Sequence, residues 1–405
     1  MAEARPPVNA NYPVMPRYAH IVGWGIALPE NKLTNNDIAA FMDTSDEWIQ
    51  SRTGIEQRYV VNERESTATL GLRAAQQALK VTDILPNELD LIVVATCTPD
   101  NAFPSTASLI QNWLGATHAG AFDLGAACSG FVYALEMAAQ AIRSGSANSA
   151  LVIGAETMTR VIDWQDRATA VLFGDGAGAV VLEASETEGG ILFSVMRSDG
   201  SGHDLLILPS LHTHLNTDFK RGKLHMHGGE VFRFATRVIK ESVLEAIAKA
   251  GITLADVSLI VPHQANERII HAAARSLEID SERFMNTINR YGNTSAASIP
   301  IALYEAVREK RVHEGDYIIF VGFGGGLSWA SLVIKWGIPR PESRQGSLIN
   351  RQRRQFGYNL VRYRNWWRRT RRRINETINR IRPQYGRIYR LRHKIEEADD
   401  LDDWS

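Results

Sequence analysis

The sequence contains only two cysteines among 405 residues, Cys97 and Cys128, which excludes a disulfide framework and leads us to expect a reducing, cytoplasmic environment. No apolar run reaches the ~20 residues that a membrane-spanning helix needs. Cysteines and histidines nowhere cluster with the spacing of metal ligands, so no metal site is expected. Residues 1–17 lack a continuous apolar core, and we expect a flexible arm there and not a signal peptide.

Acidic and basic residues balance at 45 each, but they are unevenly distributed. Residues 337–405 contain 18 basic and 8 acidic residues, while residues 1–336 contain 27 basic and 37 acidic ones. The net charge is therefore near −10 for the long N-terminal part and near +10 for the C-terminal tail. This split marks residues 337–405 as a separate electrostatic unit, and the chain of 405 residues is long enough for two ordinary domains.

Continuous valine, isoleucine and leucine runs alternate with helical patterns along the chain. Such runs are typical of strands that are buried on both faces, and their alternation with helices predicts a layered α/β protein. We predict helices at residues 70–79 and 232–250. The predicted strands are residues 89–96, 150–154, 179–182, 259–261 and 317–321.

Two segments recur later in the chain, in the same order. Residues 85–93 are echoed at 254–261, and residues 173–182 are echoed at 323–334. A chance similarity between glycine-rich turns is the alternative, but two echoes in one order favour an internal duplication. We therefore predict two related α/β halves, with the boundary near residues 183–190.

Cys128 lies between a short strand, residues 121–124, and a helical pattern that begins at Val132. The N-terminus of a helix favours a thiolate, so we expect a pKa below the free value of ~8.5 and a nucleophilic cysteine. The alternative is an inert buried cysteine.

Three sites in the second half could complete a cysteine-centred mechanism. His263 follows the strand at 259–261, where its side chain can enter a cleft, although an exposed histidine is the alternative. Asn293 lies in a Gly-Asn turn and could equally be a turn former or helix cap. Glycines 324–326 could offer backbone N–H groups to an oxyanion; a phosphate loop is the alternative, but the Walker lysine is absent.

The sequence between Tyr18 and Trp336 resembles the β-ketoacyl-acyl-carrier-protein synthase III family of the thiolase-fold superfamily. The motifs that carry the resemblance are TSDEWI (44–49) with RTGI (52–55), AACSGF (126–131), FGDGAGA (173–179), HQAN (263–266) and GNTS (292–295). The resemblance implies a thiolase-like fold of two duplicated α/β halves, 18–186 and 187–336, in α-β-α-β-α layers. The basic tail, 337–405, falls outside it.

The resemblance also implies a mechanism without a cofactor. Cys128 would take an acyl group from acyl-CoA, with acetyl-CoA favoured as the primer. His263 and Asn293 would hold the thioester carbonyl of malonyl-acyl-carrier protein during loss of CO₂. The backbone N–H groups of Cys128 and Gly325 would form a second oxyanion hole.

Further residues match family positions that bind the substrates and partners. Trp48 and Arg167 would flank the CoA adenine, Arg52 would meet its phosphates, and Asn266 would bond to the pantetheine arm. Phe103 would cross a homodimer interface to limit the acyl pocket. The residues expected to face the acidic carrier protein are Arg233, Arg268 and Arg275.

The tail departs from the family. Its arginine-rich stretch carries Leu360, Trp367, Ile374 and Ile381 at intervals of seven, and residues 396–403 are acidic. Such a stretch could form an amphipathic helix on a membrane surface or another polyanion, or remain disordered and pair with acidic segments. Two alternatives to the condensing enzyme stay open: a thiolase-fold acyltransferase or condensing enzyme of secondary metabolism with another acceptor, and a binding or scaffold protein that acts through the tail.

Overall fold

The computed structural model describes residues 17–210, 219–337 and 348–381. The chain divides into two units, Met1–Arg351 and Gln352–Ser405, which are treated separately below. The expected N-terminal arm, except for Arg17, and the acidic cluster at 396–403 lie outside the described residues.

The first sheet of the larger unit has five strands in the order β1-β7-β6-β4-β5. Strand β4 runs parallel to β5 and β6, whereas β7 runs antiparallel to β6 and β1. Its strands are β1 (Tyr18–Ala27), β4 (Leu91–Ala95), β5 (Gly120–Leu124), β6 (Ser149–Thr157) and β7 (Asp175–Ser185).

The second sheet repeats this plan with four strands in the order β8-β13-β12-β11. Strand β11 is parallel to β12, and β13 is antiparallel to β12 and β8. A parallel bridge between Ile260 and Phe284 lies beside β11, in the position that β5 takes beside β4 in the first sheet. The strands are β8 (Gly190–Ser198), β11 (Val257–Pro262), β12 (Tyr317–Gly324) and β13 (Ser328–Lys335). The predicted strand runs correspond to β4, β6, β7, β11 and β12.

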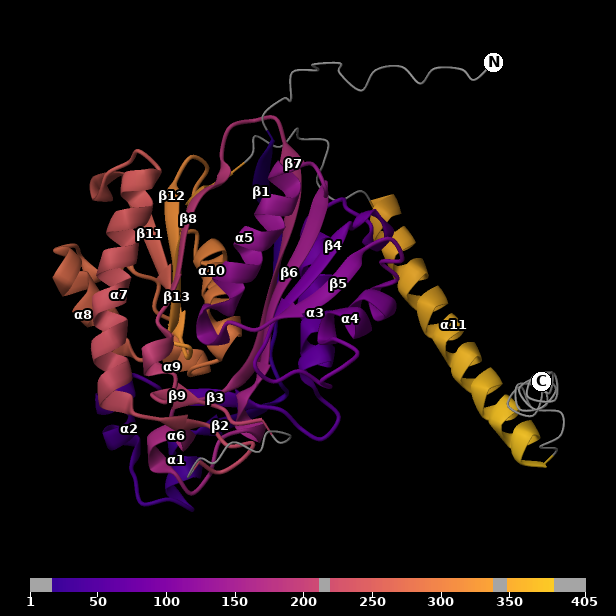
Figure 1. Ribbon diagram of the computed structural model, residues 1–405, viewed down its shortest axis with the longest axis horizontal. Helices are drawn as coiled ribbons and strands as arrows, with labels where there is room; N and C mark the ends of the chain where they lie inside the picture. Colours follow the sequence, from indigo (N-terminus) through magenta and orange to yellow (C-terminus); the bar gives the residue numbers. More distant parts are fainter. Residues whose placement is uncertain (1–16, 211–218, 338–347, 382–405) are drawn as a thin grey trace, which may run out of the picture. The chain divides into compact units, whose positions relative to one another are not determined.

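Helices form three layers around and between the sheets, so that the fold has the expected α-β-α-β-α order (Figure 1). Helices α3 (Thr67–Val81) and α4 (Thr106–Leu114) cover the outer face of the first sheet. Helices α7 (Gly228–Lys249) and α8 (Glu267–Leu277) cover the outer face of the second sheet. Helices α5 (Gly130–Arg143) and α10 (Ser298–Arg308) fill the middle layer. The two helices predicted from periodicity are α3 and α7.

The largest hydrophobic core lies between the two sheets. Phe131 and Leu135 of α5 and Leu303 of α10 pack there against Val152 of β6 and Phe320 of β12, and all five are fully buried. Each such side chain contributes about 1.5 to 3 kcal/mol relative to exposure. This shared core joins the two halves into one body.

Two short 3-10 turns precede the middle helices and occupy equivalent places in the halves. The turn η2 (Ala127–Ser129) leads into α5, and η7 (Ser295–Ala297) leads into α10. The first residue of each turn has a positive φ, 45° at Ala127 and 50° at Ser295, and the two are 168 positions apart. Because non-glycine residues adopt this conformation at a cost of about 1 to 3 kcal/mol, the surrounding packing must maintain both turns.

Each turn is seated on a glycine of the other half's sheet. A Cβ on Gly322 of β12 would lie 2.8 Å from Ser129 Cα, and one on Gly154 of β6 would lie 2.3 Å from the carbonyl oxygen of Ala296. These glycines are also 168 positions apart. Their missing side chains allow the turns and strands of opposite halves to meet, which brings the Cys128 turn and the Asn293 loop together.

The remaining elements gather at one end of the sheets (Figure 1). Residues 48, 52, 53, 167, 168, 206 and 226 of these elements line the cavity described below. The elements are α1 (Asn35–Ala39), α2 (Asp46–Thr53), α6 (Arg167–Ala170), α9 (Ile288–Tyr291), β2 (Asn31–Thr34), β3 (Gln57–Val60), β9 (Leu206–Ile207) and β10 (His225–Met226).

Helix α11 (Leu348–Ile381) is the described part of the tail and is 34 residues long. We left open whether the arginine-rich stretch is helical or disordered, and these residues form a helix. Among the described residues, no helix is long and apolar enough to cross a membrane.

Candidate active site

One cavity of about 560 Å³ brings most of the predicted site residues together. Its walls include Gly324 at the end of β12, and residue 325, which we predicted as an oxyanion donor, comes next in the chain. Phe103, Arg275 and Gly325 do not line the cavity. The predicted residues that do are Cys128, His263, Asn293, Trp48, Arg52, Arg167, Asn266, Arg233 and Arg268.

Cys128 lies in the turn η2, where β5 passes into the middle layer, and is only 7% exposed. Our expectation of a lowered thiol pKa is wrong for this structure. Burial raises the pKa of Cys128 to about 12, because little solvent remains to stabilise a thiolate. The hydrogen bond with Ser295 lowers the pKa and the Glu156 carboxylate raises it, but both effects are smaller than that of burial.

Two polar residues near the thiol, Ser295 and Glu156, were not predicted from the sequence. The Ser295 Oγ lies 3.4 Å from Cys128 Sγ and 3.0 Å from Glu156 Oε1, and its single hydrogen can donate to either atom. The fully buried Glu156 also accepts from Thr98 Oγ1 at 2.6 Å and from the backbone N–H of Cys97. Two signals pointed to them: Ser295 belongs to the GNTS motif, and Glu156 is a charged residue two positions after a predicted buried strand.

His263 follows strand β11 and is 2% exposed. Its Nδ1 lies 2.6 Å from Ser298 Oγ, and that oxygen already accepts the backbone N–H of Gln264. If the Ser298 hydroxyl donates to Nδ1, the proton of the neutral ring is on Nε2. Burial lowers the pKa of His263 to about 3, so the ring is neutral near pH 7.

Asn293 is held by backbone hydrogen bonds on both sides and by its own side chain. Its N–H donates to the Leu172 carbonyl at 2.9 Å, and its carbonyl accepts from Gly174 at 3.0 Å. The side-chain Oδ1 accepts the N–H of Ser295 at 2.9 Å. The amide oxygen of Asn293 is therefore already used. Because Asn293 lines the cavity, its Nδ2 group is the part of the side chain that can donate to a substrate.

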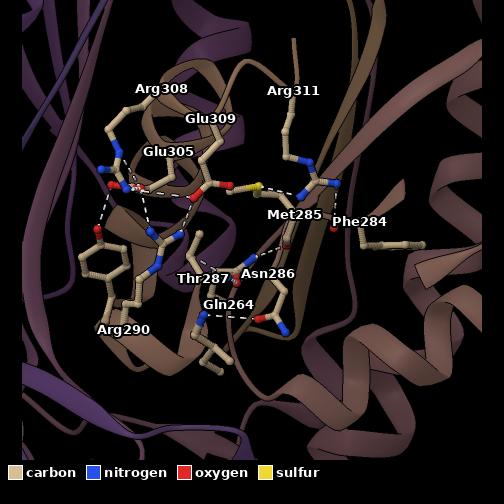
Figure 2. A network of polar contacts seen from close by, with 12 residues as sticks. Gln264, Phe284, Met285, Asn286, Thr287, Arg290, Glu305, Arg308, Glu309 and Arg311 are labelled. Carbon is tan, nitrogen blue, oxygen red and sulfur yellow. Dashed lines mark hydrogen bonds and ion pairs between the residues drawn. The ribbon is translucent and has the colours of Figure 1, made fainter. Parts of the chain in front are cut away.

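A polar network ties the His263 loop to the segment that leads to Asn293 (Figure 2). Gln264 donates to the carbonyl of Met285 at 3.0 Å and accepts from the N–H of Thr287 at 2.8 Å. Farther along, Arg290 forms ion pairs with Glu305 and Glu309 at 2.8 and 3.0 Å. These contacts fix the two predicted donors relative to each other.

Trp48 and two arginines form a cationic and aromatic wall at the cavity. The Arg167 guanidinium carbon is 4.7 Å from the centre of the Trp48 ring, and that of Arg52 is 6.0 Å away. The Arg167 Nη1 also donates to the Asp43 carbonyl at 2.7 Å. Because Arg167 already contacts the indole, a purine placed between them has to displace the guanidinium from the ring.

Asn266 and the arginines near it line the same wall or lie on its helix. Asn266 caps α8 by accepting from the Arg268 N–H at 2.9 Å and donates to the Arg52 carbonyl at 3.0 Å. One of its two amide hydrogens remains for another acceptor. Arg275 is exposed and lies seven residues after Arg268, on the same face of α8. Arg233 pairs with Glu230.

Phe103 lies away from the cavity walls, next to Pro104, and is 87% exposed. A large aromatic side chain that is so open to solvent does not contribute to the hydrophobic core of its own chain. Its predicted role in the acyl pocket therefore requires a second subunit.

A cysteine from one half and two neutral donors from the other line a single cavity in a duplicated, five-layered fold. These features define a condensing enzyme of the thiolase fold. Two family models match the chain: 3-oxoacyl-[acyl-carrier-protein (ACP)] synthase III over residues 122–200, and its C-terminal domain over 247–336.

Known proteins are similar over nearly their whole lengths. A β-ketoacyl-[acyl-carrier-protein] synthase III from Roseiflexus sp. is 49% identical, over 80% of this chain and 99% of the relative. The crystal structure of the synthase III from Aquifex aeolicus is 47% identical, with a TM-score of 0.75 over 78% of this chain and 100% of its own. A polyketide priming β-ketosynthase is 36% identical, with a TM-score of 0.77 over 82% and 100%. The chain belongs to the β-ketoacyl-acyl-carrier-protein synthase III family.

Proposed function

We propose that this protein condenses an acyl-CoA primer with malonyl-acyl-carrier protein to give a 3-oxoacyl-acyl-carrier protein, the first condensation of type II fatty acid synthesis. The observation that carries the proposal is the single cavity lined by Cys128, His263 and Asn293. Near 49% identity to a synthase III over most of the chain supports the same reaction.

In the first half-reaction, Cys128 Sγ attacks the thioester carbonyl of acyl-CoA. The bond from the carbonyl carbon to the CoA sulfur breaks, the acyl group remains on Cys128, and the thiol proton leaves with CoA. Because the pKa of the resting thiol is about 12, the proton is lost during the attack and not before it. The backbone N–H groups of Cys128 and Gly325 are the proposed donors to the tetrahedral oxyanion.

In the second half-reaction, His263 Nε2–H and Asn293 Nδ2–H donate to the thioester carbonyl of the malonyl group. The bond to the carboxylate breaks, CO₂ leaves, and its electron pair forms an enolate on the held carbonyl. The enolate carbon then attacks the acyl-Cys128 carbonyl and releases the thiolate. One preorganised donor to a developing oxyanion contributes about 3 to 4 kcal/mol. The scheme uses no metal and no cofactor.

The substrate contacts are part of the same proposal. Trp48 and Arg167 would take the CoA adenine, Arg52 its phosphates and Asn266 its pantetheine arm, since guanidinium groups bind phosphate and stack on bases. Arg233 and Arg268 at the cavity would meet the acidic carrier protein, and Arg275 extends this basic surface along α8.

The assembly and its location complete the proposal. We infer a cytoplasmic homodimer in which the exposed Phe103 enters the acyl pocket of the partner subunit and favours acetyl-CoA as the primer. The free state of both cysteines supports a reducing location.

The test is intact-mass measurement after incubation with a panel of acyl-CoAs, followed by malonyl-acyl-carrier protein. We expect acylation that is lost in Cys128→Ala, retained in Cys97→Ala as the matched control, and discharged as a 3-oxoacyl product on the carrier. Failure of every acyl-CoA to acylate the protein would refute the proposal.

The similarity to a polyketide priming β-ketosynthase supports a second candidate, a condensation that primes secondary metabolism. The same assay separates the two, because preference for a primer other than acetyl or for a polyketide carrier protein would favour the second. Acylation without discharge by malonyl-acyl-carrier protein would indicate acyl transfer to another acceptor. An intact set of Cys128, His263 and Asn293 speaks against an inert scaffold.

A further inference from the structure

Helix α11 has a composition unlike that of any other helix among the described residues. Between residues 348 and 381 the sequence contains eleven arginines, no lysine and a single acidic residue, Glu376. The family match ends at residue 336, and the 49% identical relative is covered almost completely by 327 residues of this chain. The helix therefore lies beyond the part of the chain that matches the family model.

The exposed apolar residues of α11 gather mainly in one stripe, whereas Tyr358 and Val361 are buried and lie outside it. At 3.6 residues per turn, six of the exposed residues fall within an arc of about 60°. Each is between 49% and 70% exposed, which is unusual for side chains of this size. The stripe consists of Phe356, Leu360, Tyr363, Trp367, Ile374 and Ile378.

Aromatic rings cluster in the middle of the stripe. The ring of Tyr363 is 6.2 Å from that of Trp366 and 6.4 Å from that of Trp367, and the two tryptophan rings are 5.6 Å apart. Tryptophan and tyrosine are enriched where an apolar phase meets water, because their rings are apolar and each carries one polar group.

In the C-terminal half of the helix, exposed arginines occupy the sides and the back of the stripe. Arg368, Arg369 and the run Arg371 to Arg373 are exposed, and by helical geometry they spread over about 200° on the sides and back of the stripe. A strongly basic face opposite a narrow face of aromatic and aliphatic residues is the pattern of helices that lie in the interface of a bilayer.

We propose that α11 binds the surface of an anionic phospholipid bilayer, with the stripe entering the boundary between headgroups and acyl chains. From Phe356 to Ile378 the stripe is about 33 Å long, which suits a flat surface. The charge is complementary to anionic headgroups, which attract basic segments.

Two other occupants fit the helix less well. A second copy of α11 packed along the stripe would bring eleven arginines next to eleven others, and this repulsion opposes pairing. Nucleic acid would satisfy the arginines, but Leu360, Ile374 and Ile378 have no ring to stack on bases and would gain little from phosphates.

The experiment is flotation of the full-length protein with two kinds of vesicle, phosphatidylcholine alone and phosphatidylcholine with 30% phosphatidylglycerol. Three variants accompany the natural chain. The stripe variant combines Leu360→Gln, Trp367→Gln and Ile374→Gln; the charge variant combines Arg371→Gln, Arg372→Gln and Arg373→Gln. The matched control combines Asn365→Gln and Asn375→Gln, which lie off the stripe. Circular dichroism checks helix content, and condensation measured without vesicles checks the enzyme body.

We expect the natural chain and the control to bind the anionic vesicles and not the neutral ones. The stripe variant should bind at least tenfold more weakly, and the charge variant about a hundredfold, since each arginine near an anionic surface adds to affinity. Brominated acyl chains should quench the fluorescence of the natural chain more than that of the stripe variant.

Several results would overturn the proposal. One is absence of binding to either vesicle, and another is equal binding to both. A stripe variant that binds as tightly as the natural chain would show that only charge matters, which would favour nucleic acid or another polyanion. Self-association that depends on the stripe and prevents vesicle binding would favour a second copy of the chain.

Discussion

At the residue scale, the proposed chemistry depends on groups that burial keeps neutral. Burial raises the pKa of Cys128 to about 12 and lowers that of His263 to about 3, so near pH 7 the cavity holds a thiol and a neutral imidazole and no ion pair between them. Neutral donors can stabilise an oxyanion that forms only during the reaction, and they place no permanent positive charge in the cavity.

The first prediction concerns the Cys128 thiol and its two polar neighbours. The rate of Cys128 alkylation by iodoacetamide should rise with pH without a plateau up to about pH 10. Ser295→Ala removes a hydrogen bond that lowers the thiol pKa, and Glu156→Gln removes a charge that raises it, so at pH 8.5 the first variant should react more slowly and the second faster. Mass spectrometry separates labelling of Cys128 from that of Cys97.

Equal rates in both variants would contradict the assigned roles of Ser295 and Glu156. A plateau near pH 8 in the natural protein would contradict the raised pKa itself.

The second prediction concerns His263 and acid stability. In the unfolded chain its imidazole takes up a proton below about pH 6.5, whereas in the folded chain it does so only near pH 3. The unfolded state therefore binds more protons between these values, and His263 destabilises the fold as the pH falls from 6.5 toward 3, by at most about 1.4 kcal/mol per pH unit.

Denaturant unfolding at several pH values between 4.5 and 7.5 measures this slope. The free energy of unfolding of His263→Asn should depend less steeply on pH than that of the natural chain. Identical slopes, or an imidazole that titrates near pH 6.5 in the folded protein by NMR, would refute the prediction.

The sequence predicted which residues line the site better than it predicted their environment. Cys128, His263 and Asn293 could be found because each lies at the end of a recognisable strand or turn. The thiol pKa could not, since it depends on burial by residues distant in the sequence, such as Ser295 and Gly324, and a local helix-end argument does not include them.

At the element scale, two matched turns and two matched glycines build the site. The duplication read from residues 85–93 and 254–261 corresponds to equivalent 3-10 turns and strands: Pro86–Glu88 before β4, and Leu254–Asp256 before β11. The repeat could not predict that a turn of each half packs on a strand of the other half. Such packing produces no periodic pattern in the sequence, and its only trace is two isolated glycines, Gly154 and Gly322.

The third prediction follows from this packing. Gly154→Ala should lower the free energy of unfolding by about 3 kcal/mol, because its Cβ would overlap the Ala296 carbonyl, which is backbone and cannot rotate away. Denaturant unfolding measures the change. Gly120→Ala in β5 is the matched control, since its Cβ would meet nothing closer than 3.9 Å. A Gly154→Ala protein as stable as the control would contradict the proposed seating of the turn.

At the scale of the whole molecule, the chain combines a body that matches the synthase III family with a basic helix beyond it. The relatives match 78% to 82% of this chain and nearly all of their own lengths. The motifs of the body made its fold predictable. The tail has no counterpart in those motifs. From its arginine-rich sequence alone we could not decide between a helix and a disordered segment.

The fourth prediction tests the independence of the body. A chain that ends at Arg351, the last residue of the larger unit, should retain kcat/KM within about twofold and an unchanged melting temperature. Steady-state condensation assays and calorimetry measure the two quantities. A loss of more than tenfold in kcat/KM would mean that the tail takes part in the reaction.

The seating of each turn on a glycine of the opposite half also bears on how the protein is made. During synthesis the ribosome delivers Cys128 long before His263, Asn293 and the strand that carries Gly322. Until those later segments arrive, the first half lacks the strand surface on which the cysteine turn packs. The cysteine turn therefore reaches its native packing only after the strand that carries Gly322 has been synthesised.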